Sequence, residues 1–302
     1  MTFSEDVRRE LVSRPPAKPC CRLAFLSGLI RHAGSLQVRR RGEVAVVAEL
    51  GDPAAARLAF LLVRERGAEC EILSFREHRF ERRNRVLLRI FGDRGQQLLH
   101  EAGVLTAGLA PLEHPPGRLL NRACCRASYL RGAFVAAGSI SAPRRPAHLE
   151  LRTAELESAG ALAAVAGREG IHMRTAVRRG HAIAYLKGRE AIRDLLATVG
   201  AHDAVLSFEE AQVISATREA VNRLTNCDRA NLERTSAAAH RQRTAISQLD
   251  LDLLAPDLRR VAELRLRHPE SSLAELGQKA TPPMTKSAVA RRIKTLISLT
   301  ET

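Results

Sequence analysis

The stretch CCRLAFLSGLIRHAGSL at residues 20–36 occurs a second time in the chain, as CCRASYLRGAFVAAGSI at residues 124–140. The two copies align without a gap at an offset of 104 positions and share eight of seventeen residues. Chance is a poor explanation for this agreement. An internal repeat indicates a fold that is assembled from similar units, and each copy is expected to form the first helix of its unit.

The segments after the two copies are predicted to have the same order of secondary structure, from apolar spacing that is helical or alternating. After the first copy we expect strands at residues 35–40 and 43–50, a helix at 53–66, strands at 70–75 and 85–91, and a helix at 94–102. After the second copy we expect strands at residues 139–141 and 148–152, a helix at 155–168, strands at 171–177 and 181–185, and a helix at 189–199. Residues 106–122 are rich in turn-forming residues and are predicted to connect the two αββαββα units.

Small residues stand at matched places in the two first helices. Gly28 matches Gly132, and Gly34 matches Gly138. Small side chains allow two helix backbones to approach closely, as a pair related by a pseudo-two-fold axis requires. Gly34 and Gly138 also suit the ends of helices, where glycine is common, and the two roles are compatible.

The order of the repeat and its motif resemble the LAGLIDADG homing-endonuclease fold. In that family an acidic residue at the eighth motif position of each repeat helps to bind divalent metal ions. The matching positions here are Ala33 and Ala137, whose methyl groups cannot replace the oxygen ligands that two-metal cleavage needs. The nearest acids, Glu43 and Glu150, are expected one strand away. The resemblance therefore implies a LAGLIDADG scaffold without catalytic residues and without metal at these degenerate positions.

Composition favours a nucleic-acid partner. The net charge is +15, and a cation of this size attracts anionic partners. Aromatic residues make up only 3% of the chain and tryptophan is absent, whereas single-strand and RNA binders use aromatic stacking. We therefore expect double-stranded DNA. No segment suits a membrane span, a membrane-surface helix or a secretory signal, so a soluble intracellular protein is expected.

The cysteines and histidines give no recognisable metal motif. None of the six cysteines forms a C-x-x-C pair, and the ten histidines are scattered. Neighbouring cysteines on a helix point about 100° apart, so Cys20 and Cys21 alone cannot hold one ion as a spaced pair would. We expect buried, inert thiols, no metal site and no cofactor.

The chain beyond residue 200 is predicted to be helical. Long helices are expected at residues 208–226 and 229–249, and a shorter one at 257–267 with Leu258, Val261, Ala262 and Leu266 on one face. Ser272 and Glu275 have capping-box spacing before the next helix. The turn at residues 281–285 and a final helix, KSAVARRIKTLISL at 286–299, complete a predicted helix-turn-helix.

The final helix is the candidate for reading DNA. Its apolar stripe is formed by Val289, Ile293, Leu296 and Ile297, and no acidic residue occurs from residue 285 to 299. The second helix of such a motif enters the major groove, where arginine suits guanine and lysine suits phosphate. An isolated basic helix can instead be a solvated amphipathic helix, but the capped preceding helix, the turn and the overall charge favour DNA. The candidate DNA-binding residues are Thr285, Lys286, Ser287, Ala290, Arg291, Arg292 and Lys294.

Over essentially its full length, the chain resembles the WhiA family of bacterial sporulation and cell-division transcription regulators. The resemblance rests on LSGLIRHAGSL, LRGAFVAAGSI, AYLKGREAIRDLLATVGAH, NRLTNCDRANLERT and SLAELGQKATPPMTKSAVARRIKTL. It implies a cytoplasmic, nucleoid-associated regulator of sporulation, cell-division and chromosome-segregation genes. It also implies, in actinobacteria, a WhiB-type iron–sulfur partner. The predicted fold class is α+β, with LAGLIDADG-like repeats at residues 1–107 and 108–205 and a helical linker with helix-turn-helix at 206–302.

Several interpretations stay open. Arg79, Arg82 and Arg83, with Arg76, Arg85 and Arg89, crowd one expected hairpin, which is either an auxiliary DNA-contacting surface or a solvated hairpin. The side chains of Asn222, Asn226, Asn231 and Arg223 either cap and bridge helices or touch DNA. Two other functions compete with regulation: a divergent metal-dependent DNA endonuclease, and a protein-interaction scaffold with incidental DNA binding.

Overall fold

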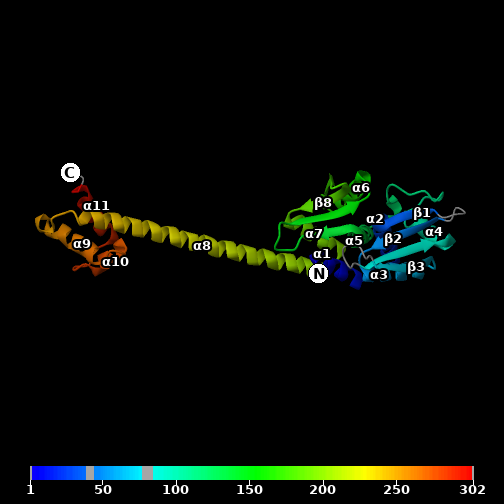
Figure 1. Cartoon of the computed structure of the whole chain (residues 1–302), viewed down its shortest axis with the longest axis horizontal. Coiled ribbons are helices and arrows are strands. Elements are labelled where there is room, and N and C mark those ends of the chain that lie inside the picture. Colours follow the sequence, from blue (N-terminus) through cyan, green and yellow to red (C-terminus); the bar gives the residue numbers. More distant parts are fainter. Residues whose placement is uncertain (1, 39–43, 77–83, 301–302) are drawn as a thin grey trace. The chain divides into compact units, whose positions relative to one another are not determined.

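The computed structural model describes residues 2–38, 44–76 and 84–300. The chain divides into two compact units, Met1–Ser215 and Ala216–Thr302 (Figure 1). The first unit contains both repeats, and the second contains only helices. Among the described residues, no helix is long and apolar enough to cross a membrane.

The two repeats have the same order of elements, as the sequence predicts. The first consists of α2 (Pro19–Ala33), β1 (Gly34–Val38), β2 (Val44–Leu50), α3 (Pro53–Glu65), β3 (Glu69–Arg76), β4 (Asn84–Phe91) and α4 (Gly92–Glu101). The second consists of α5 (Ala123–Ala137), β5 (Gly138–Ile140), β6 (His148–Thr153), α6 (Leu156–Gly167), β7 (Arg174–Arg178), β8 (His181–Lys187) and α7 (Arg189–Val199). The α+β fold class and the αββαββα repeats are confirmed.

Each repeat forms one antiparallel sheet of four strands. The strand orders are β1-β2-β4-β3 and β5-β6-β8-β7, so the repeats have the same topology. The central strand β2, VAVVAEL, is buried except at Glu49, and its alternate residues Val44, Val46, Ala48 and Leu50 belong to the hydrophobic core. The first helix after β2 has a side-chain cap: Asp52 precedes α3 and accepts a hydrogen bond from the Ala54 nitrogen at 2.8 Å.

The helices α2 and α5 pack against each other at the centre of the first unit (Figure 1). Both glycines of the repeat lie at this contact. A Cβ atom added to Gly28 would overlap the Tyr129 carbonyl and lie 3.0 Å from the Ala133 nitrogen, and one added to Gly132 would overlap the Phe25 carbonyl. The helix pair predicted from the small residues is therefore present, and it is the core of the fold.

A helix that the sequence analysis did not predict packs against both repeats, on α3 of the first and on α5 and β5 of the second. This helix, α1 (Phe3–Ser13), begins with a capping box between Thr2 and Glu5 and buries Val7 and Leu11. The Ser4 hydroxyl donates to the Ile140 carbonyl at 3.0 Å and accepts from the Ile140 nitrogen at 2.9 Å. The Thr2–Glu5 spacing and the apolar residues one turn apart were the signals that could have found it.

The two long helices expected at residues 208–226 and 229–249 are instead one helix. The observed α8 (His202–Ile246) has 45 residues and no interruption. Residues 202–246 contain neither glycine nor proline, so nothing in the chain ends the helix near residue 227. The domain boundary expected after residue 205 falls within α8.

The second unit has a small core of its own. After α8 follow α9 (Pro256–Arg267), α10 (Leu273–Lys279) and α11 (Lys286–Ser298). Their apolar faces meet in one cluster, which also includes the last residue of α8: Ile246, Val261, Ala262, Leu276, Val289, Ile293 and Leu296. The helices predicted over this region are confirmed.

Candidate nucleic-acid interface

The helix α10 is fixed at its start by the predicted capping box. The Glu275 nitrogen donates to the Ser272 hydroxyl at 3.3 Å, and the Ser272 nitrogen donates to the Glu275 carboxylate at 2.7 Å. These two bonds satisfy amide groups that have no partner within the helix. The capped start determines the direction in which α10 leads into the turn.

The turn between α10 and α11 depends on a glycine. The Met284 nitrogen donates to the Gly277 carbonyl at 2.9 Å. A Cβ atom on Gly277 would overlap the Met284 carbonyl oxygen and lie 3.6 Å from a methyl group of Val289. The turn therefore folds back directly on α10, and only glycine permits this approach.

The helix α11 buries one face and exposes the other. Val289, Ile293 and Leu296 are at most 2% exposed, and the side chain of Ile297 packs against the same core. Thr285 precedes the helix as its N-cap, and its hydroxyl accepts from the Ala288 nitrogen at 3.2 Å. The predicted apolar stripe is confirmed, and it fixes which side chains face outward.

The outward face of α11 is basic. Lys286, Ser287, Arg291 and Lys294 are exposed, and Ala290 is half-buried beside them. Ser287, Arg291 and Lys294 are spaced four and three residues apart, so they share one face. Within the part of the chain that the structure describes, no acid pairs with Lys286, Arg291 or Lys294. The face can therefore meet an anion without first breaking an ion pair.

Arg292 has a different environment from the other basic residues of α11. Its guanidinium lies 3.2 Å from the Asp257 carboxylate of α9, and its side chain is only 30% exposed. This contact ties α11 to α9. The sequence analysis included Arg292 among the candidate DNA-binding residues but did not foresee its partner, which is 35 residues away.

A buried arginine of α9 holds the loop that leads into the helix-turn-helix. Arg265 is 1% exposed and donates to the Ser271 carbonyl at 2.6 Å, in the loop that leads into α10. Burial lowers the pKa of this guanidinium from its ordinary value. The sequence analysis assigned the apolar face of α9 but missed this residue, because an arginine inside an amphipathic helix is usually exposed.

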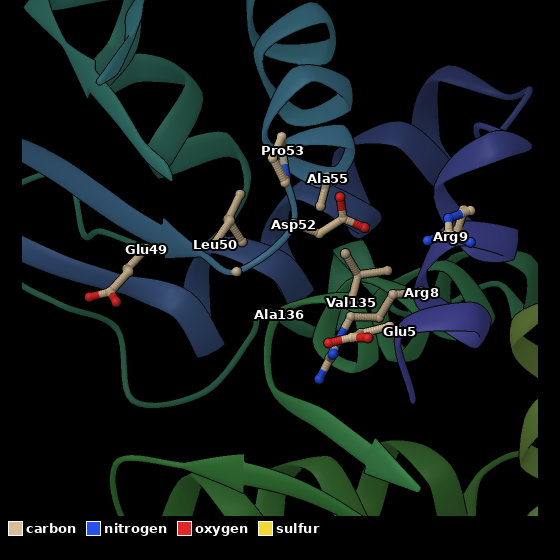
Figure 2. Close-up of a pocket in the computed structure, with 11 residues that line it drawn as sticks. Glu5, Arg8, Arg9, Glu49, Leu50, Asp52, Pro53, Ala55, Val135 and Ala136 are labelled. Carbon is tan, nitrogen blue, oxygen red and sulfur yellow. The ribbon is translucent and has the colours of Figure 1, made fainter. Parts of the chain in front are cut away.

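The ends of α2 and α5 carry the positions that resemble metal-binding acids. Ala33 and Ala137 are the last helical residues, and both are half-buried. Beside Ala137, the Arg8 guanidinium donates to the Gly138 carbonyl. A pocket at this end is lined by Arg8, Asp52 and Val135, among others (Figure 2). A cation therefore stands next to one of the two alanine positions.

Of the two acids that the sequence analysis expected nearest to these positions, Glu150 has partners in its own sheet and Glu43 lies outside the described residues. The Glu150 carboxylate lies 3.1 Å from His148 and within 3.7 Å of Arg178. Although burial alone acts to raise it, the pKa of Glu150 is lowered by the hydrogen bond and charge of His148 and by Arg152. The Glu150 carboxylate therefore pairs with residues of its own sheet.

Some of the remaining candidate residues have partners within the protein, and others lie outside the residues that the structure describes. Arg79, Arg82 and Arg83 lie outside the described residues. Arg89 of the same hairpin is buried, 2.8 Å from Glu71, and stacks over the Phe91 ring at 4.9 Å. On α8, Asn231 accepts from Arg234 at 2.6 Å, and Asn222 and Asn226 are exposed.

The expectation of buried, inert thiols is correct for the burial of Cys21 and Cys125, whereas Cys227 is exposed. It treated Cys20 and Cys21 alone, but the pairing of α2 with α5 brings Cys124 and Cys125 to them. The sulfur atoms of all four cysteines lie within 4.8 Å of one another. The signal was present in the repeat itself, since both copies begin with the same two cysteines.

Comparison with known proteins agrees with this architecture. Three sequence profiles match the chain: the WhiA N-terminal LAGLIDADG-like domain at residues 19–105, the WhiA LAGLIDADG-like domain at 126–218, and the WhiA C-terminal helix-turn-helix domain at 221–300. The chain belongs to the WhiA family. The helix-turn-helix match at residues 221–300 covers the whole of α9, α10 and α11.

Relatives and a solved structure from this family extend over the full chain. A probable cell division protein WhiA from Heliobacterium modesticaldum is 37% identical and aligns over 100% of this chain and 96% of its own length. Another from Desulforudis audaxviator is 39% identical, over 100% and 97%. The crystal structure of full-length WhiA from Thermotoga maritima has a TM-score of 0.60 and 26% identity and covers 100% of this chain and 98% of that one.

These comparisons support part of the function implied by the resemblance. The chain has a helix-turn-helix DNA-binding domain and LAGLIDADG-like domains, and its relatives carry the name of probable cell division proteins. Sporulation and a WhiB-type partner, which the resemblance implies in actinobacteria, find no support in these names. They stay predictions, as do the domain boundaries after residues 107 and 205.

Proposed function

We propose that this member of the WhiA family is a sequence-specific DNA-binding transcription regulator in which α11 enters the major groove. The observation that carries the proposal is the outward face of α11, which is basic and free of ion pairs with described residues. The proposed contacts are made by Thr285, Lys286, Ser287, Ala290, Arg291, Arg292 and Lys294. The regulated genes are those of cell division and chromosome segregation, including sporulation genes where the organism sporulates.

The side chains of α11 divide into two proposed roles. Arg291, on the exposed face with Ser287, is suited to the O6 and N7 atoms of a guanine. Lys286 and Lys294 are suited to phosphates, which fix the position of the protein without specifying the base. Arg292 adds a phosphate contact only by turning away from Asp257, from which it is 3.2 Å distant. Specificity is therefore assigned mainly to Arg291 and Ser287.

The LAGLIDADG-like unit is proposed to be catalytically inactive. Its positions for metal-binding acids are Ala33 and Ala137, and the Arg8 guanidinium is held at Gly138. A cation at this place opposes the binding of a divalent metal ion. The protein is proposed to act in the cytoplasm on the nucleoid, and a WhiB-type iron–sulfur regulator is the proposed partner in an actinobacterial host.

Selection of binding sites from a random DNA library, together with a genome-wide binding map, tests the proposal. A recurring motif that is enriched in the library and found upstream of cell-division genes is the expected result. A mutant with Lys286 and Arg291 both changed to alanine should lose the motif. If that mutant occupies the same genomic sites as the wild type, the chain reaches DNA through another protein and is an interaction scaffold.

Incubation of the pure protein with plasmid DNA and magnesium separates regulation from a divergent endonuclease. We expect intact plasmid at all protein concentrations. Specific cutting that disappears in Glu49→Gln or Glu150→Gln would contradict the inactive scaffold. The same change in a surface acid, Glu190→Gln, serves as the control for contaminating nuclease, because Glu190 is exposed on α7.

A further inference from the structure

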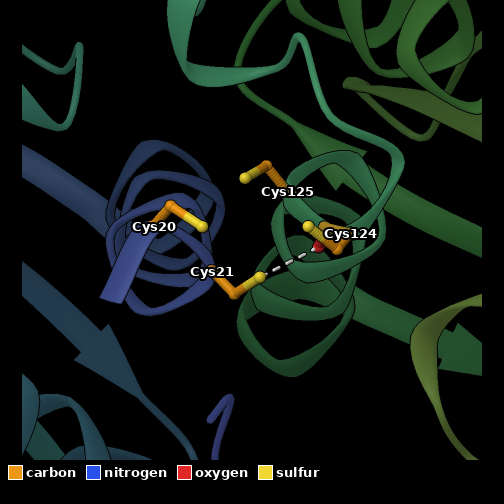
Figure 3. Close-up of side chains that lie close together, drawn as sticks. All are labelled: Cys20, Cys21, Cys124 and Cys125. Atoms are coloured by element: carbon orange, nitrogen blue, oxygen red, sulfur yellow. Dashed lines mark hydrogen bonds between the residues drawn. The ribbon is translucent and has the colours of Figure 1, made fainter. Parts of the chain in front are cut away.

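Four cysteines meet at the end of the α2–α5 pair that is opposite to Ala33 and Ala137. Cys20 and Cys21 lie in the first turn of α2, and Cys124 and Cys125 lie in the first turn of α5. All four sulfur atoms lie within 4.8 Å of one another, and all four are free thiols. Figure 3 shows the side chains pointing into the space between the two helices. Cys21 and Cys125 are buried, and Cys20 and Cys124 are half-buried.

We propose that these four cysteines bind one zinc ion as a tetrahedral tetrathiolate. Zinc–sulfur bonds of about 2.3 Å place neighbouring sulfurs about 3.8 Å apart. Sulfur atoms that already lie within 4.8 Å reach this spacing by small side-chain rotations. An iron–sulfur cluster puts several iron and sulfide atoms between the thiolates and so requires wider spacing. On binding, the four thiols release their protons to solvent, and each thiolate donates one electron pair to the ion.

The surroundings suit a site with net negative charge. A zinc ion with four thiolates carries two negative charges in excess, and both helices direct their N-terminal ends at the site. The partial positive charge of a helix N-terminus stabilises thiolates. Arg122, the residue before α5, interacts electrostatically with Cys20. Two helix ends and a guanidinium therefore offset the charge.

An ion can reach the site from solvent. A cleft in the first unit is lined by the cluster members Cys20 and Cys125, together with Leu23, Leu119, Asn121 and Arg122. Cys20 and Cys125 therefore face this entrance, and Cys21 is the other buried member of the cluster. The cluster therefore has the number of ligands, the spacing and the path of entry that a metal site needs.

The position of the site gives it a structural role. Cys20 and Cys21 belong to the first repeat, and their counterparts 104 positions later belong to the second. One ion would therefore fasten the two repeats together beside the glycine contact of α2 with α5. A four-coordinate site with no open position fits a structural rather than a catalytic ion. We expect zinc to raise the stability of the first unit and to leave the outward face of α11 unchanged.

Cobalt(II) is the probe for the test, because tetrahedral cobalt thiolate absorbs visible light whereas zinc is colourless. The full chain, purified in reducing buffer and stripped with a chelator, is titrated with Co²⁺ and then with Zn²⁺. We expect one cobalt per chain, with absorption typical of tetrahedral thiolate ligation, and its complete loss when zinc displaces cobalt. The melting temperature should rise with zinc. A chain that binds neither ion under these conditions overturns the proposal.

A double variant of the half-buried pair, Cys20→Ser with Cys124→Ser, locates the ion. Loss of an outer-shell partner alone costs about 10–100-fold in metal affinity, so loss of two ligands should weaken zinc binding by more than about 100-fold. Cys227→Ser is the matched control, because Cys227 is exposed on α8, and it should bind cobalt as the wild type does. Unchanged cobalt absorption in the double variant overturns the assignment.

Alkylation of the wild type avoids dependence on a variant that fails to fold. Zinc should protect Cys20, Cys21, Cys124 and Cys125 from iodoacetamide, while Cys227 reacts with and without zinc. Equal reaction of the four cysteines with and without zinc contradicts the proposal. Mass spectrometry of the untreated chain distinguishes the redox alternative: a disulfide between the two helices that forms in place of metal binding, in reducing buffer, also contradicts it.

Discussion

Gly28 and Gly132 make equivalent contacts across the α2–α5 pair. Gly28 lies against the backbone of Tyr129, one turn before Gly132, and Gly132 lies against the backbone of Phe25, one turn before Gly28. A Cβ on Gly28 would overlap the Tyr129 carbonyl, and a Cβ on Gly132 would overlap the Phe25 carbonyl. Phe25 and Tyr129 are themselves matched residues of the repeat. The contact is therefore symmetric, and the retained LAGLIDADG helices serve as the structural centre of the first unit.

Bulk at either glycine should destabilise the first unit. Gly28→Leu and Gly132→Leu force the helices apart, and overpacking of a core typically costs about 1–3 kcal/mol. Thermal unfolding of the full chain measures the effect. Gly160→Leu is the control, because Gly160 lies in α6 with nothing within 4 Å of an added Cβ. A Gly28→Leu chain as stable as the control would show that the helices do not pack at this glycine.

Restoring the acids should not restore metal binding at the other end of the helices. Ala33→Asp and Ala137→Asp place carboxylates at the C-terminal ends of helices, where the helix dipole disfavours negative charge. At residue 33, burial of a carboxylate without a partner adds a cost of about 1–3 kcal/mol. We expect lower melting temperatures for the single and double variants, without rescue by magnesium and without plasmid cleavage. Melts with and without magnesium are the measurement. A double variant that magnesium stabilises would mean that the ancestral site is still formed.

His32 should make the first unit sensitive to acid. Burial, with a smaller effect of Arg31, lowers the pKa of His32 to about 3, and its imidazole lies 3.4 Å from the Tyr129 hydroxyl. In the unfolded chain this pKa is about 6.5. Between pH 3 and pH 6.5 His32 is protonated in the unfolded chain but neutral in the folded chain. Its contribution to the free energy of unfolding is therefore complete above pH 6.5 and is lost as the pH falls toward 3.

The variant His32→Gln should weaken this dependence. The slope of unfolding free energy with pH between about 4 and 6 should fall by up to about 1.4 kcal/mol per pH unit, the value for one proton. Denaturant unfolding at a series of pH values gives the slope. His181→Gln, at an exposed position of β8, should leave it unchanged. Equal slopes in wild type and His32→Gln would show that His32 is protonated in the folded chain.

Gly277 should be indispensable to the helix-turn-helix. In Gly277→Ala the new methyl group overlaps the Met284 carbonyl, so the turn must move and α11 with it. We expect destabilisation of the second unit by about 1–3 kcal/mol and weaker DNA binding. Gln278→Ala, at the next and exposed position, is the control for both measurements. Wild-type affinity in Gly277→Ala would show that α11 is not positioned by this turn.

Much of the architecture could be predicted because the repeat supplied each element twice. The sequence analysis was least successful where contacts between distant segments determine the role of a residue. It divided α8 into two helices near residue 227, although no residue there breaks a helix. It missed α1, whose apolar residues are few. Arg265 and the four cysteines gain their roles only when distant segments meet, Arg265 by its bond to Ser271 and the cysteines by the pairing of α2 with α5.

The most direct test of the central claim is the affinity of α11 variants for the selected DNA site, measured by fluorescence anisotropy over a range of salt concentrations. Arg291→Ala should cost about 1–3 kcal/mol and relax specificity at one base pair. Lys286→Ala should weaken all sequences evenly and reduce the salt dependence. Arg260→Ala, an exposed arginine of α9, is the control and should bind as the wild type does. If Arg291→Ala and Lys286→Ala also bind with wild-type affinity and salt dependence, α11 is not the recognition helix.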